Sequence, residues 1–172
     1  MAKEANLLVT FDPTHQESAL KVIESLLNGV KEKVSVLKAN EGVAELAVKD
    51  AKKAVKQLSS LADKEMEKFS HTFHWIPIDK WCKNTVADIQ KNIKDFAKDI
   101  KQNDKWKMDL KVRKVKEKPD EIKLILKLTE VIDRPKVDLQ NPDKIIKVEV
   151  IGNKAGLALL GKDELLNVAA KS

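Results

Sequence analysis

One stretch of the chain has the spacing of a phosphate-binding loop, in which backbone amides and a lysine hold nucleotide phosphates. Gly156 and Gly161 are separated by four residues, and Lys162 follows directly. The next residue is Asp163, a carboxylate where such a loop needs a serine or threonine hydroxyl for magnesium. The four intervening residues are all apolar, which is typical of a buried strand. We therefore expect no nucleotide cofactor here.

Three side chains could bind a metal ion by their type, namely His71, His74 and Cys82, and Cys82 could also act as a nucleophile. Residues three apart on a strand point to opposite faces, so His71 and His74 cannot close on one ion. Cys82 is the single cysteine and supplies no second thiolate. As a nucleophile it would need an orienting carboxylate or an anion hole, and the sequence indicates neither. We expect no metal site and no catalytic residue in this set.

Asp138 and Asp143 form a carboxylate pair of the kind that acid–base catalysis uses in a cleft. They flank Asn141-Pro142, however, and an Asn-Pro pair is typical of a type I turn. Turn and capping roles explain both carboxylates. The sequence therefore predicts that this chain is not an enzyme.

A basic cluster is the strongest functional signal in the chain. The segment 101–118 contains only three acidic residues, Asp104, Asp109 and Glu117. It contains eight basic residues: Lys101, Lys105, Lys107, Lys111, Arg113, Lys114, Lys116 and Lys118. Alternation places Lys107, Lys111 and Arg113 on the outward face of one strand, with the later lysines in its exit loop. Such aligned cations can follow a phosphate backbone, although a solvated lysine face has the same composition. Trp106 points inward with the apolar set, so no base-stacking platform is predicted.

The elements that position these residues fall into two groups. Residues 1–77 predict the order strand, helix, strand, strand, helix, strand, with strands at 6–10, 33–38, 43–48 and 69–76. Asp12-Pro13 and Asp50 are expected to begin the two helices, and Asn40-Glu41-Gly42 favours a hairpin. Two helices crossing one antiparallel sheet is the ferredoxin-like arrangement. Pro77 ends the last strand and places a domain boundary there.

Residues 78–172 predict a second unit. Apolar spacing places a helix from about 86 to 100, capped by Asn84 or Thr85, and alternation places strands at 106–113, 144–151 and 155–160. Pro119-Asp120-Glu121 favours a helix to about Asp133, because acidic residues suit a first helical turn. The run 122–128 also has the period of a strand, so both interpretations stay open. A short helix is expected at 163–169.

Composition limits the class of protein. The 172 residues can form one medium domain or two small ones, and the net charge of +6 is compatible with a polyanionic partner or with an ordinary lysine-rich surface. The longest uncharged apolar run, Gly156–Gly161, is far too short for a membrane span. A single cysteine is typical of a reducing compartment, so we expect a cytoplasmic protein without membrane attachment.

A resemblance to a known family rests on the segment Val137–Val150, which reads V-D-L-Q-N-P-D-K-I-I-K-V-E-V. It resembles the C-terminal signature of the THUMP domain, a module of tRNA-modifying proteins, and the elements of residues 78–172 follow that family's order. Residues 1–77 resemble the ferredoxin-like domain that commonly precedes THUMP. The stretch Val137–Leu160, including N-K-A-G-L-A, is most similar to stand-alone THUMP adaptors of tRNA cytidine acetylation in archaea and eukaryotes.

This resemblance implies an α+β fold with a ferredoxin-like N-terminal domain, residues 1–77, and a THUMP α/β domain, residues 78–172. It implies binding to the acceptor end of tRNA, and not to DNA, with 4-acetylcytidine formed by a separate tRNA acetyltransferase. Lys111, Arg113 and Lys114 fall where the family places basic residues on and after its first strand, and Asn153 also matches a family position. With Lys107 and Lys116 from the basic cluster, they make up the expected RNA-binding set. The chain has lysines where many members have arginines, and lysine gives less shape specificity toward phosphate.

Two other functions remain open from the sequence. The second interpretation is the RNA-binding portion of another tRNA-modification enzyme, such as a methyltransferase, a thiouridine synthase or a pseudouridine synthase, whose catalytic part is absent here. The chain's positive charge would also suit a protein-interaction module that docks an acidic partner.

Overall fold

The computed structural model describes residues 4–171. These residues form two compact units: one comprises the chain up to Ile78 together with the segment from Asp163 onward, and the other comprises Asp79–Lys162. Each unit has its own apolar core. The fold class is α+β, with two sheets and four α-helices in the described residues. Within that part of the chain, no helix combines the length and the apolar character needed to cross a membrane.

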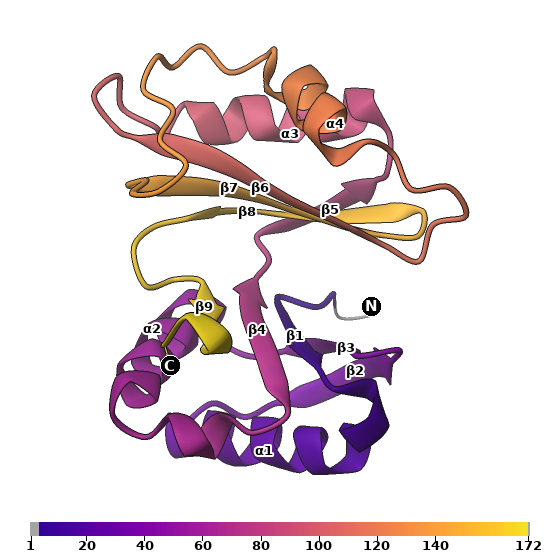
Figure 1. Ribbon diagram of the computed structural model, residues 1–172, viewed down its shortest axis with the longest axis vertical. Helices are drawn as coiled ribbons and strands as arrows, with labels where there is room; N and C mark the ends of the chain where they lie inside the picture. The colour runs from indigo at the N-terminus through magenta and orange to yellow at the C-terminus, as the bar shows by residue number, and fades with distance from the viewer. Residues whose placement is uncertain (1–3, 172) are drawn as a thin grey trace. The chain divides into compact units, whose positions relative to one another are not determined.

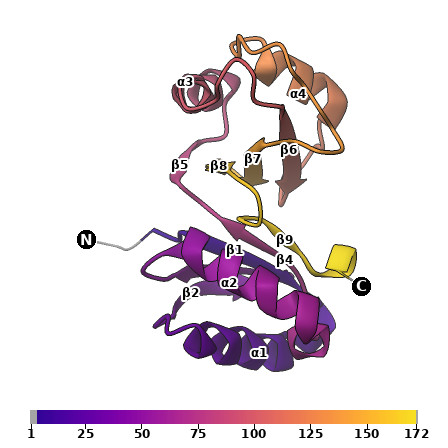
Figure 2. The same cartoon turned by 90° about the vertical axis from the view of Figure 1, so that its left-hand side faces the viewer.

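The first unit has the predicted strand and helix order. Its elements are β1 (Leu7–Phe11), α1 (Gln16–Gly29), β2 (Ser35–Asn40), β3 (Val43–Ala47), α2 (Ala51–Lys64) and β4 (Thr72–Pro77). The antiparallel sheet runs β2-β3-β1-β4, which is the ferredoxin-like arrangement, with a further strand, β9 (Leu166–Asn167), beside β4. Both helices pack on one face of the sheet, where Leu27, Leu58 and Trp75 are fully buried (Figure 2).

Aspartate caps begin both helical segments, as the sequence predicts. Asp12 accepts the backbone N–H of Thr14 at the start of a short 3-10 helix (Pro13–His15) that leads into α1, and Asp50 accepts that of Lys53 at the start of α2. Hydrogen bonds from the side chain of Thr14, and then from His15, lower the pKa of the Asp12 carboxyl to about 2.

The second unit is a four-stranded sheet in the order β5-β8-β7-β6. Its elements are β5 (Lys80–Lys83), α3 (Val86–Ala97), β6 (Trp106–Arg113), α4 (Glu121–Thr129), β7 (Lys144–Ile151) and β8 (Lys154–Leu160). β6 and β7 are parallel, whereas the other neighbours are antiparallel. α3 and α4 cover one face of the sheet, and the core between them contains Trp106, Leu110 and Val148 (Figure 1).

The open question about residues 122–128 is settled in favour of a helix. Asp120 accepts the N–H groups of Ile122 and Lys123, which fixes the first turn of α4. Leu128 is fully buried against the core of the second unit, while Ile122 and Leu126 are exposed. This one-sided burial at helical spacing explains why the segment does not form a strand.

The structure contains one strand that the sequence analysis missed, and one expected helix is wrong. β5 was not expected, because Lys80-Trp81-Cys82-Lys83 shows no apolar alternation; it forms by pairing with β8. The helix expected at 163–169, in the second domain, is instead the strand β9 followed by a 3-10 helix (Val168–Lys171) in the first unit. Leu166 pairs with Trp75 of β4 and is fully buried there, and this apolar contact determines where the segment packs.

Candidate nucleic-acid interface

Successive side chains of β6 point alternately to the two faces of the sheet, as the sequence predicts. Trp106, Met108, Leu110 and Val112 are buried against the helices, whereas Lys107, Asp109, Lys111 and Arg113 lie on the opposite face of the sheet. Lys111 is exposed, and Lys107 and Arg113 are partly exposed. Lys107 lies six residues before Arg113, about 20 Å along an extended strand. The predicted set therefore spans the length of β6 and does not form one compact patch.

Arg113 takes part in a network of ion pairs across the sheet. Its Nε lies 3.3 Å from Glu149 Oε2, and Lys147 Nζ lies 3.1 Å from Glu149 Oε1. Lys147 also pairs with Asp109, with 3.3 Å between Nζ and Oδ1. Glu149 and Lys147 are buried, so the carboxylate of Glu149 depends on these two cations. The sequence pattern had suggested a solvent-facing role for Arg113, and the structure adds this internal one.

The turn between β7 and β8 brings Asn153 beside the end of β6. Gly152 has a φ of 64°, and its N–H donates to the carbonyl of Arg113 at 2.9 Å. Asn84, just after β5, donates its side-chain amide to the carbonyl of Gly152 and its backbone N–H to the carbonyl of Asn153. The backbone of Lys114 also has a positive φ, of 57°, which turns the chain out of β6. Lys114, Asn153 and the end of β5 therefore lie along one end of the sheet, the edge formed by the ends of its four strands.

Two basic residues that sequence reasoning missed join this edge. Lys83 pairs with Lys154 in the ladder between β5 and β8, Lys154 pairs with Ile151, and Ile151 pairs with Arg113. Ladder partners point to the same face, so Lys83, Lys154 and Arg113 share the face opposite the helices. We call Lys83, Lys111, Arg113, Lys114, Asn153 and Lys154 the basic edge. Lys83 escaped prediction because β5 itself did.

Trp81 supports one of these lysines. The Nζ of Lys154 lies 4.4 Å from the centroid of the Trp81 ring, within the range of a cation–π interaction. Strand β5 thus contributes both a cation and an aromatic ring next to the basic edge. Lys116 lies outside this group, exposed in the loop that follows β6.

The other chemical candidates are occupied by structural roles. The segment after Gly156 lies in β8, where Leu157, Ala158 and Leu160 are fully buried, so it is a strand and not a loop of free amides. Burial raises the pKa of the Cys82 thiol, away from the thiolate that a nucleophile needs. Asp138 accepts the N–H groups of Gln140 and Asn141, which lowers its pKa, and Asp143 accepts that of Lys105. These contacts match the turn interpretation of the two carboxylates.

Comparisons with solved structures show the same fold. The chain superposes on PH1313 from Pyrococcus horikoshii with a TM-score of 0.66 and 18% identity, covering 95% of this chain and 55% of that one. TrmN from Thermus thermophilus superposes with a TM-score of 0.54 and 16% identity, and the alignment covers 89% of this chain and 44% of TrmN. A possible methylase from Clostridium difficile 630 superposes with a TM-score of 0.57 and 9% identity, and the alignment covers 91% of this chain and 41% of the methylase. The chain thus spans about half the length of these proteins.

One of the two sequence comparisons gives a match, and it lies in the second unit. No curated protein matches the chain. The family model of the THUMP domain matches residues 83–160, which run from the end of β5 to the end of β8 and contain the whole basic edge. THUMP is an RNA-binding domain, so the match supports an RNA-binding role for this unit. Residues 83–160 of this chain therefore match the THUMP domain.

Proposed function

We propose that this chain is a tRNA-binding adaptor, which presents the acceptor end of tRNA to a separate acetyltransferase for 4-acetylcytidine formation and performs no chemistry itself. The RNA-binding part of this proposal is supported by the basic edge, which lies within the residues that match the THUMP domain. The adaptor part rests on the resemblance of Val137–Leu160 to stand-alone adaptors.

The charges of the basic edge suit a phosphate backbone. Neighbouring strands are about 4.8 Å apart, so a row across four strands spreads its cations over a length of about 14 Å. Among the described residues, neither Lys83 nor Lys111 forms an ion pair, and both residues are exposed. We assign phosphate contacts to Lys107, Lys111, Arg113, Lys114 and Lys116, with Lys83 and Lys154 added by the structure. Asn153 offers an amide that can hydrogen-bond to a ribose or a base.

The decisive experiment separates RNA binding from the adaptor role. Affinity for tRNA is measured with and without its single-stranded 3′ end across a salt series. A purified tRNA cytidine acetyltransferase is then assayed with and without this chain. The proposal requires weaker binding to the truncated tRNA and faster acetylation when the chain is present. Equal affinity for both RNAs would refute the acceptor-end assignment, and unchanged acetylation would refute the adaptor role.

The length of the matched structures favours a second candidate. Because the chain covers only 41–55% of those proteins, it corresponds to the part of each that the alignment includes. This suits an RNA-binding portion of a methyltransferase, a thiouridine synthase or a pseudouridine synthase, whose catalytic part lies outside these residues. Co-purification with one of these activities, without any effect on acetylation, would favour this candidate.

A groove in the first unit favours a third candidate function, a protein-interaction module. It has a volume of about 850 Å³ and lies between α1 and α2, with apolar walls from Val22, Leu26, Val30 and Leu61 and with Lys21, Lys64 and Lys68 around them. Such a groove has the chemistry to accept an acidic, partly apolar segment of a partner protein. Retained binding to an acidic partner after loss of tRNA binding would favour a protein-interaction module.

A further inference from the structure

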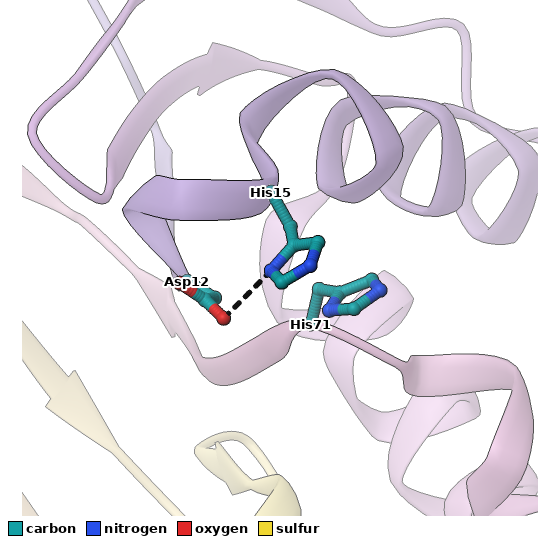
Figure 3. Close-up of side chains that lie close together, drawn as sticks. All are labelled: Asp12, His15 and His71. Carbon is teal, nitrogen blue, oxygen red and sulfur yellow. Dashed lines mark hydrogen bonds and ion pairs between the residues drawn. The ribbon is translucent and has the colours of Figure 1, made fainter.

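Asp12 and His15, which are neighbours in the sequence, meet the distant His71 in the first unit (Figure 3). His15 Nδ1 lies 2.9 Å from Asp12 Oδ2, and the rings of His15 and His71 are stacked with their centroids 4.3 Å apart. The ligand atoms of the three groups all lie within 4.8 Å of one another. His74, three residues after His71 in the sequence, lies outside this group and contacts Thr10, with 3.1 Å between its Nδ1 and the threonine Oγ1.

The backbone holds this arrangement in place. Asp12 follows β1 directly, His15 ends the short 3-10 helix, and His71 precedes β4. The N–H of Asp12 donates to the carbonyl of His71 at 2.9 Å, which ties the two segments together. His71 has a φ of 67°, a conformation that few residues other than glycine adopt and that histidine tolerates better than most. The site is thus built by the fold and not by one flexible loop.

The carboxylate of Asp12 is oriented toward the histidines. Its Oδ1 accepts the backbone N–H and the hydroxyl of Thr14, at 2.9 and 2.7 Å, while its Oδ2 faces His15. A hydrogen-bonded partner that fixes a ligating carboxylate is a regular feature of protein metal sites. Half of the His15 side chain is exposed to solvent, so an ion can reach the group directly.

We propose that Asp12, His15 and His71 bind one divalent transition-metal ion of the Zn²⁺ type. Two imidazole nitrogens and one carboxylate oxygen are a common zinc donor set, and water would complete a tetrahedron. Ligands of tetrahedral zinc, at 2.0–2.1 Å, are about 3.4 Å from one another. The ligand atoms that lie up to 4.8 Å apart must therefore approach, whereas Asp12 Oδ2 and His15 Nδ1, at 2.9 Å, must separate slightly. The two rings lie 13° from parallel, and one imidazole must rotate to direct its lone pair at a shared ion.

Metal binding would link the end of β1 to the beginning of β4. The site lies wholly in the first unit, outside the THUMP match at residues 83–160, so it is independent of the RNA-binding proposal. An ion that binds the folded state and not the unfolded chain stabilises the fold by mass action. We therefore expect zinc to raise the unfolding temperature of the first unit.

The test uses the full chain with Cys82→Ser, which removes the only thiol, and titrates it with Zn²⁺ by calorimetry and with Co²⁺ by absorption. We expect one ion per chain and the visible bands of a four-coordinate cobalt site. His15→Gln or His71→Asn should weaken binding by more than about 100-fold, beyond the 10–100-fold effect of losing an outer partner. Asparagine is chosen at position 71 because it tolerates a positive φ.

His74→Gln is the matched control, because it removes an imidazole three residues from His71 that lies outside the cluster. It should bind zinc as the parent does. Circular dichroism without metal checks that each variant is folded. Absence of stoichiometric binding by the parent overturns the proposal. Equal affinity of the parent and the His15→Gln or His71→Asn variants, or loss of binding in His74→Gln, overturns it as well.

Discussion

Arg113 and Glu149 are joined across the parallel strands β6 and β7, with 3.3 Å between the arginine Nε and Oε2 of the glutamate. The carboxylate is buried, whereas the arginine side chain is 23% exposed. Arg113 thus belongs both to the buried network of ion pairs and to the exposed basic edge. Its effects on stability and on RNA binding must be separated before either is assigned to it.

Replacing Arg113 by alanine is expected to lower the free energy of unfolding by about 1–3 kcal/mol, because a buried carboxylate loses a charged hydrogen-bond donor. Urea denaturation measures this. Lys111→Ala is the control on the same strand face, and it should change stability by no more than about 0.5 kcal/mol. Equal stability of the two variants would mean that the Arg113–Glu149 pair contributes nothing measurable.

Replacing Lys83 and Lys111 together by alanine tests RNA binding without touching that network. Each lysine that neutralises a phosphate contributes about 0.7–0.9 to the slope of log affinity against log salt. The double variant should therefore lower the slope by about 1.4–1.8 and weaken all tRNAs similarly. Fluorescence anisotropy at several salt concentrations gives the slope.

Lys53→Ala with Lys56→Ala, on the exposed side of α2, removes the same charge from the first unit. This control should leave the salt slope nearly unchanged. If the two double variants lose affinity equally, tRNA binds a diffuse positive surface and the basic edge has no special role.

Asp138 makes stability depend on acid pH. Its backbone hydrogen bonds, mainly to the N–H of Asn141, lower the pKa of the folded-state carboxyl below its ordinary value of 3.8. A lowered folded-state pKa means that the contribution is fully present above 3.8 and is lost as the pH falls through the folded-state pKa. We expect Asp138→Ala to lower the unfolding temperature at pH 7 and to lower it much less near pH 2. An equal difference at both pH values would contradict this role.

Gly42 is expected to resist substitution. Its φ is 80°, and a Cβ placed there would lie 2.9 Å from the carbonyl oxygen of Phe11, closer than real Cβ contacts. Gly42→Ala should destabilise the first unit by more than about 1 kcal/mol, because strain and a steric clash add. Gly29→Ala is the control: it ends α1, and no atom lies within 4 Å of the added Cβ. Thermal unfolding should find Gly29→Ala neutral or slightly stabilising.

Most elements could be predicted because their signals are local. The alternation of residues 106–113 gives β6 its observed bounds, and the aspartate caps place α1 and α2 within a few residues. β5 and β9 carry no such signal, because each is short and exists only through pairing with a distant strand. Local pattern cannot show which distant strand a short segment will pair with.

The residues proposed for RNA binding and for metal binding show the same division between local and long-range signals. Lys107, Lys111 and Arg113 were found because they alternate on one strand. Lys83 and Lys154 join them only through the β5–β8 ladder, and Glu149 meets Arg113 only through the register of two parallel strands. His15 and His71 stack although they are separated by most of the first unit. Partners brought together by tertiary pairing leave no trace in sequence spacing.

The strand β9 changes how the chain must be divided. Because Asp163 and the residues after it return to the first unit, the THUMP-containing unit is an insertion between β4 and β9. One cleavage near Ile78 would not release two intact units, since it would separate β9 from the rest of its own sheet and leave the edge of β4 without a partner. Two cuts, on either side of Asp79–Lys162, are needed, and a short bridge between Ile78 and Asp163 would then restore the first unit as a continuous polypeptide.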